Sequence, residues 1–223
     1  MATDDLPANP WLRLPRVAPY VLDEDRLAVE VFNADAPVHA RLHVDTCPEP
    51  FFGDPDAPIV VLLLNPGVSE DGRYDDGLHA TVSGDGRTQR HFYIGSDNRW
   101  WRKLVSALAR ERPGVDVARR VLSVEFIAYR SRSFGCGQLR LPSQAYAFAL
   151  VRRAIRRGAA VVIVRGERHW IGAVPELHGH AQRVSIVNPQ SAALSARNLA
   201  GDGFARLLAA LDHAEESERA TPA

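Results

Sequence analysis

The chain has 223 residues, 46% of them hydrophobic, which suits one large globular domain. Lys and Arg together number 27, as do Asp and Glu, so the formal net charge is zero and no overall basic field points to nucleic acid. The two cysteines are too few for a disulfide scaffold, a four-cysteine zinc site or an iron–sulfur cluster. No stretch reads as a secretory signal or a transmembrane helix, so we expect a cytoplasmic protein outside any membrane.

Residues 1–50 read as an extension that packs on a larger domain. Five prolines fall in its first 37 residues, and a short helix is expected near residues 23–31. Residues 38–45 alternate between apolar and polar side chains, a pattern that predicts a half-buried edge strand. His39 and His43 would lie on its polar face, where solvated side chains are a simpler interpretation than a metal site.

The most informative stretch is residues 59–69, where six apolar residues are followed by Asn65, Pro66 and Gly67. An unbroken apolar run of this length is typical of a strand that is covered on both faces in a parallel α/β sheet. Pro66 and Gly67 then favour a turn. Open α/β sheets bind their ligands at the carboxyl ends of the strands, where Asn65 would lie, although an ordinary turn also favours asparagine.

Helices and strands alternate through the rest of the chain. Residues 47–58 and 69–97 read as loops, and the second is long enough to suggest a function. Strands are predicted at 121–129, 159–164 and 183–187. Helices are predicted after Asn98, with Trp101, Leu104, Val105 and Leu108 on the buried face; after Pro142; and around Phe204, Leu207, Leu208 and Leu211.

These elements predict an α/β fold, specifically a three-layer α/β/α sandwich with a mainly parallel four-stranded central sheet. The domain would span residues 51–214, and residues 215–223 would form a disordered tail.

Two predicted strands end in the same dipeptide, Asn65-Pro66 and Asn188-Pro189. Because parallel strands place their carboxyl ends at one edge of the sheet, we expect both amides to face one crevice. Between them lie an aromatic pair, Phe92 and Tyr93, and the run Asn-Arg-Trp-Trp at 98–101. The second Asn-Pro is followed at 190–197 by Gln-Ser-Ala-Ala-Leu-Ser-Ala-Arg.

These motifs, in this order, resemble those of the uracil-DNA glycosylase superfamily, most closely its mismatch-specific branch. Members of that branch carry Gly-Ile-Asn-Pro-Gly after a strand, then Asn-Arg-aromatic-Trp, and finally Asn-Pro-Ser-Gly-Leu-Ser. The resemblance extends over residues 59–211 and has three departures. The loop at 69–97 is longer than expected for the simple enzymes of this family. Leu63 replaces the first glycine, and the last motif is longer around residues 190–193.

The resemblance implies a monofunctional DNA glycosylase, which flips a base out of the DNA and hydrolyses its N-glycosidic bond by water attack. The base would be uracil or another damaged or mismatched base. Asn65 would position the water and Asn188 would polarise a base oxygen. The base would be bound by Gly67, Phe92, Tyr93 and Asn98, and the DNA by Ser191, Leu194 as a wedge, Ser195, Arg197, Arg130 and Arg132.

No cofactor or metal is expected, the partner would be DNA, and the protein would act as a monomer. The alternative is a catalytically inactive protein of this fold that binds nucleic acid or a nucleotide-like small molecule. Charge around the crevice distinguishes the two, because DNA phosphates need cations. A rim that contains Arg130, Arg132, Arg140 and Arg197 would favour the enzyme. A rim that contains Asp71, Asp75, Asp76 and Asp85 would favour the binder of a small molecule.

Overall fold

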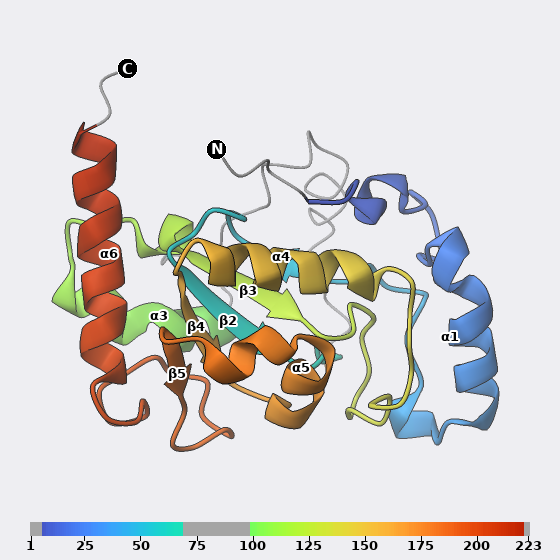
Figure 1. The fold of residues 1–223 in the computed structure, drawn as a ribbon. Helices are drawn as coiled ribbons and strands as arrows, with labels where there is room; N and C mark the ends of the chain where they lie inside the picture. The colour runs from blue at the N-terminus through green and yellow to red at the C-terminus, as the bar shows by residue number, and fades with distance from the viewer. Residues whose placement is uncertain (1–5, 69–98, 221–223) are drawn as a thin grey trace.

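A computed structural model describes residues 6–68 and 99–220 of the chain (Figure 1). The predictions for the loop at 69–97, for Phe92, Tyr93 and Asn98, and for the four aspartates at 71–85 fall outside the described residues.

The described residues form an α/β fold around a five-stranded mixed sheet, so the predicted fold class is confirmed at this level. The sheet has one more strand than expected, because a two-residue strand lies in the stretch that we read as a loop at 47–58. This strand pairs antiparallel with its neighbour, while the other four strands run parallel. In spatial order the strands are β1 (Phe51–Phe52), β3 (Val121–Glu125), β2 (Ile59–Leu63), β4 (Ala160–Ile163) and β5 (Arg183–Ser185).

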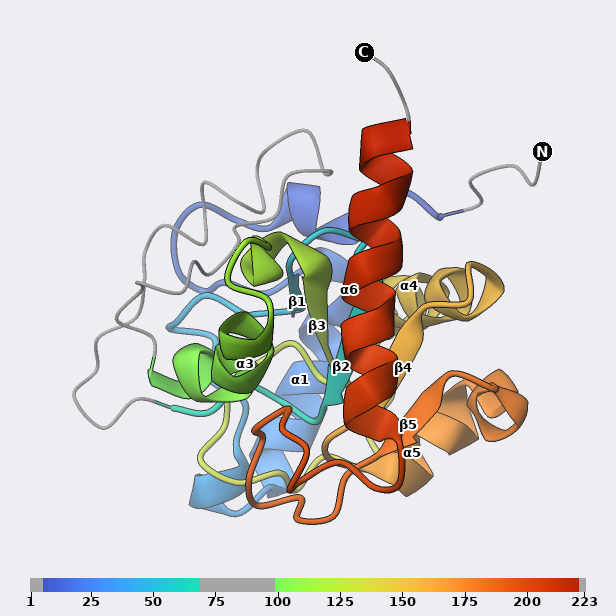
Figure 2. The same cartoon turned by 90° about the vertical axis from the view of Figure 1, so that its left-hand side faces the viewer.

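Helices pack on both faces of the sheet (Figures 1 and 2). One face is covered by α3 (Arg99–Glu111) and α6 (Gly203–Ala220), and the other by α4 (Gln144–Arg156) and α5 (Glu167–Ala173). Since β2 contacts both layers, all five of its side chains are buried, which explains the unbroken apolar run. The predicted inner face of α3 is also buried, from Trp101 to Leu108.

The carboxyl-terminal tail differs from the prediction. Helix α6 continues to Ala220, so the segment that was expected to be disordered from residue 215 is helical up to that point. Arg120 forms an ion pair with Glu215 at 2.8 Å, and this contact holds the second half of the helix against the domain. Short 3-10 helices complete the described elements: η1 (Pro10–Arg13), η2 (Val38–Ala40), η3 (Val117–Arg120) and η4 (Pro175–Gly179).

The amino-terminal extension contains the predicted helix, α1 (Asp23–Asp35), but not the predicted strand. Residues 38–40 form η2, and only an isolated bridge joins His43 to Arg130. The Asn33 side chain bonds both the N–H and the C=O of Leu42, at 2.8 Å each, and so takes the backbone groups that a strand would use. The alternating pattern arises instead because Ala40 and Leu42 are buried while their neighbours are not.

Asp25 anchors α1 to the domain. Its buried carboxylate accepts a hydrogen bond from the Tyr129 hydroxyl at 2.8 Å and one from the Ser143 backbone N–H at 3.0 Å. The Tyr129 oxygen in turn accepts a bond from the Leu22 N–H at 3.2 Å. Burial raises the pKa of the Asp25 carboxyl above its ordinary value. The network therefore joins three elements that are far apart in the sequence.

We expect Asp25→Ala to lower the free energy of unfolding by about 2–3 kcal/mol, because it leaves buried donors on Tyr129 and Ser143 without an acceptor. Asp35→Ala, at the exposed end of the same helix, is the matched control and should change stability by less than about 0.5 kcal/mol. Urea unfolding measures both variants. Equal, small effects would show that the network does not anchor the helix.

Candidate functional site

The strand order creates a crevice at the carboxyl edge of the sheet. The chain continues from β2 to α3 on one face, and from the adjacent β4 to α5 on the other. Such a reversal between neighbouring parallel strands opens a space beyond their carboxyl ends, where α/β proteins bind ligands. A pocket of about 360 Å³ lies there, lined by the ends of β2 and β3 together with residues that follow β4 and begin α3.

Asn65 lies in this pocket, as predicted, directly after β2. The Ser131 hydroxyl donates to the Ser133 carbonyl at 2.9 Å, so its oxygen accepts the Asn65 Nδ2–H bond at 2.8 Å. A second Nδ2 contact, to the Pro66 carbonyl at 3.2 Å, holds the same orientation. The amide nitrogen is therefore occupied, and Oδ1 has no hydrogen-bond partner in the described parts of the chain. It is available to accept a bond from a water or a ligand.

The backbone beneath Asn65 is fixed by a buried tryptophan. Trp170 of α5 is fully buried, and its indole N–H donates to the Leu63 carbonyl at 2.7 Å. The Leu64 carbonyl accepts the Ile127 N–H at 2.8 Å, which ties the strand end to the chain after β3. Asn65 is thus presented by rigid backbone rather than by a loose turn.

Glu125, the last residue of β3, is a pocket residue that the sequence analysis missed. It pairs with Leu63 in the sheet register and is half-buried, and its Oε2 is buried with no hydrogen-bond partner among the residues described. Burial and then the neighbouring Glu49 carboxylate raise the pKa of Glu125 well above its usual range, although Arg130 and Arg165 act in the opposite direction. A carboxyl with a strongly raised pKa in a crevice is a candidate for binding or catalysis.

Arg130 is a buried structural residue that connects the segments around the pocket, and it is not an exposed DNA contact. Its guanidinium forms an ion pair with Glu49 and donates to the carbonyls of Gly67 at 2.7 Å and Cys47 at 3.2 Å. It is 9% exposed. The prediction that Arg130 binds phosphate is therefore wrong, because internal acceptors already occupy the side chain.

Trp100 and Arg165 complete the rim of the pocket. Trp100, at the start of α3, is 37% exposed and lines the pocket, whereas its neighbour Trp101 is buried in the core. Arg165 follows β4, is exposed, and donates from Nε to the Pro189 carbonyl at 3.3 Å. The pocket thus combines an aromatic surface, an amide, two carboxyls and a cation.

The second predicted amide does not enter the pocket. Asn188 is exposed, and its Oδ1 accepts the Gln190 N–H at 3.0 Å in a local turn. Its backbone N–H donates to Asn198 Oδ1 at 3.0 Å. The prediction of two amides facing one crevice is wrong, because β5 ends at Ser185 and the Asn188 side chain serves the turn that follows.

Leu194 is also in a different environment from the predicted one. It is fully buried in the cluster beneath α3, and its N–H donates to the Leu104 carbonyl at 2.9 Å. A side chain in this position cannot enter the base stack, so the wedge prediction is wrong. The loop is organised by Asn198, which sequence analysis missed; its Nδ2 donates to the carbonyls of Ser191 at 2.6 Å and Ala193 at 3.0 Å.

The remaining predicted contacts are spread around the site. Gly67 lines the pocket through backbone atoms, and Ser191 and Ser195 are half-buried in the loop of the last motif. Arg197 and Arg132 are exposed, and Arg132 lines a separate groove beside residues 38–45. Their contacts with DNA stay predictions.

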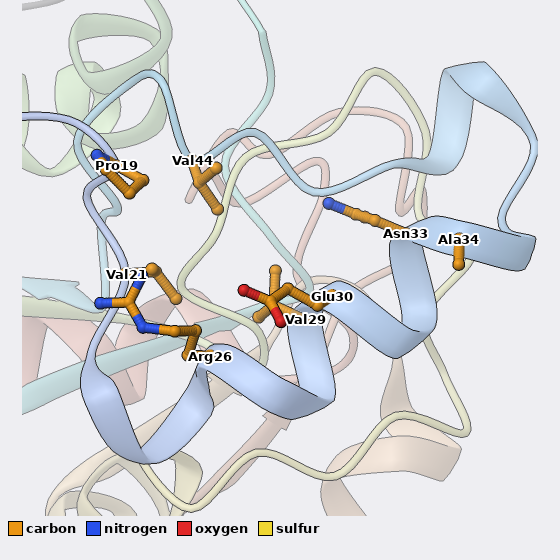
Figure 3. Close-up of a pocket in the computed structure, with 8 residues that line it drawn as sticks. All are labelled: Pro19, Val21, Arg26, Val29, Glu30, Asn33, Ala34 and Val44. Atoms are coloured by element: carbon orange, nitrogen blue, oxygen red, sulfur yellow. The ribbon is translucent and has the colours of Figure 1, made fainter.

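A second hollow, of about 340 Å³, lies beside α1 and faces Pro19, Val21 and Val44 (Figure 3). Two of its three polar side chains already make structural contacts: Arg26 pairs with Asp23 at 2.9 Å, and the Asn33 amide bonds to the backbone of Leu42. This hollow offers less chemistry to a ligand than the pocket at Asn65.

Within residues 6–68 and 99–220, no three His, Cys, Asp or Glu side chains are grouped as metal ligands would be. Nor does any helix in those ranges combine the length and apolar character needed to cross a bilayer. No protein-family model matches the sequence, and comparisons with curated proteins and with solved structures found no match.

Two of the missed residues had a signal in the sequence. Glu125 is the single charged residue in the predicted strand at 121–129, and a carboxylate in a buried strand is costly unless it has a role. Arg165 follows the apolar run at 159–164, the same position after its strand that Asn65 holds after residues 59–64. In both cases the carboxyl end of a parallel strand marks the site.

We expect Leu194→Ala to lower the free energy of unfolding by about 2–4 kcal/mol, since it removes a core side chain and leaves a cavity. Val187→Ala, at a 63% exposed position of the same segment, is the control and should have little effect. Thermal or urea unfolding measures both. A Leu194→Ala protein of unchanged stability with weakened DNA binding would instead support the wedge.

Proposed function

We propose that the protein is a hydrolase of the glycosylase type, which cleaves the N-glycosidic bond of uracil or another damaged or mismatched base in DNA. We further propose that its fold is the α/β/α sandwich of the uracil-DNA glycosylase superfamily. The main support is Asn65, whose amide nitrogen is held by Ser131, so that Oδ1, at the carboxyl end of β2, has no hydrogen-bond partner among the described residues.

Asn65 suits the positioning of a water molecule. Its Oδ1 accepts a hydrogen bond from the water and turns a lone pair of the water oxygen toward the anomeric carbon. The new C–O bond forms as the C–N bond breaks, and the electron pair of the C–N bond leaves with the base. The products are an abasic sugar and the free base. An amide does not accept the proton of the water, so this proton passes to solvent or to the departing base.

The other pocket residues suit a planar ring. Trp100 offers a partly exposed aromatic surface at the rim, and Leu63 and Phe52 add apolar surface. Aromatic side chains bind flipped bases by stacking. Arg165 at the rim supplies a cation within reach of a phosphate or a polar base edge.

A second candidate is a binder of a nucleotide-like small molecule without glycosylase activity. It is favoured by the two carboxyls in the pocket, Glu49 and Glu125, and by the structural roles of Leu194 and Arg130, which leave fewer groups to grip DNA. Excision assays separate the two functions. Oligonucleotides that carry uracil or other lesions are incubated with the protein and treated with alkali, and strand cleavage then reports abasic sites.

We expect Asn65→Ala to lower the single-turnover excision rate by about 10²–10³-fold, the effect of removing one preorganised polar group from an active site. DNA affinity should change little, because the change removes no positive charge. Asn188→Ala is the matched control, and its rate should stay close to that of the parent because this amide serves a turn.

Two results would contradict this assignment. If Asn65→Ala excises as fast as the parent, Asn65 does not position the water. If the parent excises none of the bases, yet binds a nucleotide or nucleoside in calorimetry, the second candidate is correct.

A further inference from the structure

We propose that Glu125 is the general acid of this pocket, donating its proton to the departing base; the inference rests on the proposed hydrolysis. Glu125 ends β3 opposite Leu63 and lines the same pocket as Asn65, which follows β2. Asn65 and Glu125 therefore come from the ends of two neighbouring parallel strands. One supplies an acceptor for the attacking water, and the other supplies a proton for the leaving group.

Among the described residues, no cation forms an ion pair with the Glu125 carboxyl. Arg130, after β3, is taken up by Glu49 and by the carbonyls of Cys47 and Gly67. Arg165, after β4, donates from Nε to the Pro189 carbonyl at 3.3 Å. Glu49 itself, before β1, adds negative charge on the same side. Burial and the Glu49 carboxylate favour the neutral acid at Glu125, and they outweigh the opposite effect of Arg130 and Arg165.

The buried oxygen of Glu125 supports the same assignment. Oε2 has no hydrogen-bond donor within the part of the chain that the structure describes. A carboxylate oxygen buried without a donor is costly, whereas a neutral acid tolerates that position. The raised pKa of Glu125 agrees with this geometry. In the described part of the chain Glu49 is ion-paired and Glu125 is not, and two neighbouring carboxyls with such different surroundings form the arrangement that acid–base sites use.

The step balances as follows. Water adds to the anomeric carbon, the C–N electron pair goes to the base, and the Glu125 O–H proton goes to a nitrogen or oxygen of that base. Glu125 is left as a carboxylate, which stabilises the positive charge that develops on the sugar. It is reprotonated through solvent by the proton that the attacking water releases.

This assignment points to a class of substrate. The more stable the anion that a base forms, the less its departure depends on an acid, so uracil needs the acid more than 5-fluorouracil does. Bases that form poor anions depart only when protonated, and a neutral carboxyl in the pocket extends the reaction to them. Glu125 would then widen the range of bases beyond uracil.

The test compares the parent with Glu125→Gln on oligonucleotides that carry uracil or 5-fluorouracil, under single-turnover conditions. Glutamine keeps the shape but has no proton to transfer. We expect a loss of about 10²–10³-fold on uracil. The loss on 5-fluorouracil should be clearly smaller, because the fluorine stabilises the departing anion.

The pH dependence gives a second readout. An acid must be protonated to act, so the parent rate should fall about tenfold per pH unit above the pKa of Glu125, and this limb should be absent in Glu125→Gln. Glu125→Asp, which keeps a carboxyl, should retain the limb at a lower rate. Glu176 on η4 is an exposed carboxylate that pairs with Arg152, and Glu176→Gln is the control, which should match the parent.

Equal losses on the two bases, or an unchanged pH limb in Glu125→Gln, would overturn the general-acid role while leaving the hydrolysis in place. Should Glu125→Gln fail to fold in a thermal melt, the parent and Glu125→Asp profiles decide, and a rate that does not fall at high pH overturns the role. A parent that releases neither base removes the proposed function, and the role of Glu125 with it.

Discussion

The ion pair between Arg130 and Glu49 is the interaction on which the pocket depends. Arg130 belongs to the chain after β3. Its guanidinium contacts Glu49 and Cys47 before β1 and Gly67 in the turn after β2, so it joins three segments. It also neutralises the Glu49 carboxylate, whereas the neighbouring Glu125 has no ion-pair partner among the residues that the structure describes. Position and electrostatics are therefore linked: the residue that shapes the turn at Asn65 also sets the environment of Glu125.

Much of the fold could be predicted, because burial on both faces and helical periodicity are local patterns. The apolar run at 59–64 contains β2, and Trp101, Leu104 and Leu108 lie on the buried face of α3, as their spacing predicts. Two features could not be predicted in this way. Strand β1 is too short to show a period. The alternating residues 38–45 do not form a strand because the Asn33 side chain bonds to the backbone of Leu42, a tertiary contact that no local pattern reveals.

The site was predictable where backbone topology decides it and unpredictable where side chains choose between partners. Asn65 lies in the pocket because it directly follows a central parallel strand, and the carboxyl ends of such strands border the crevice. Asn188 begins the same Asn-Pro dipeptide, but its side chain accepts a hydrogen bond within the next turn. Leu194 is buried in the core. A linear motif does not distinguish a side chain offered to a ligand from one used by the fold.

The most direct test of the central claim is a crystal structure of the protein with an oligonucleotide that carries 2′-fluoro-2′-deoxyuridine. The fluorine destabilises the cationic sugar, so the bond should survive while the base binds. The account predicts the base in the pocket between Trp100 and the strand ends, with a water bonded to Asn65 Oδ1 and Glu125 facing the base. A complex with the pocket empty and the base elsewhere, such as in the groove at Arg132, would contradict it.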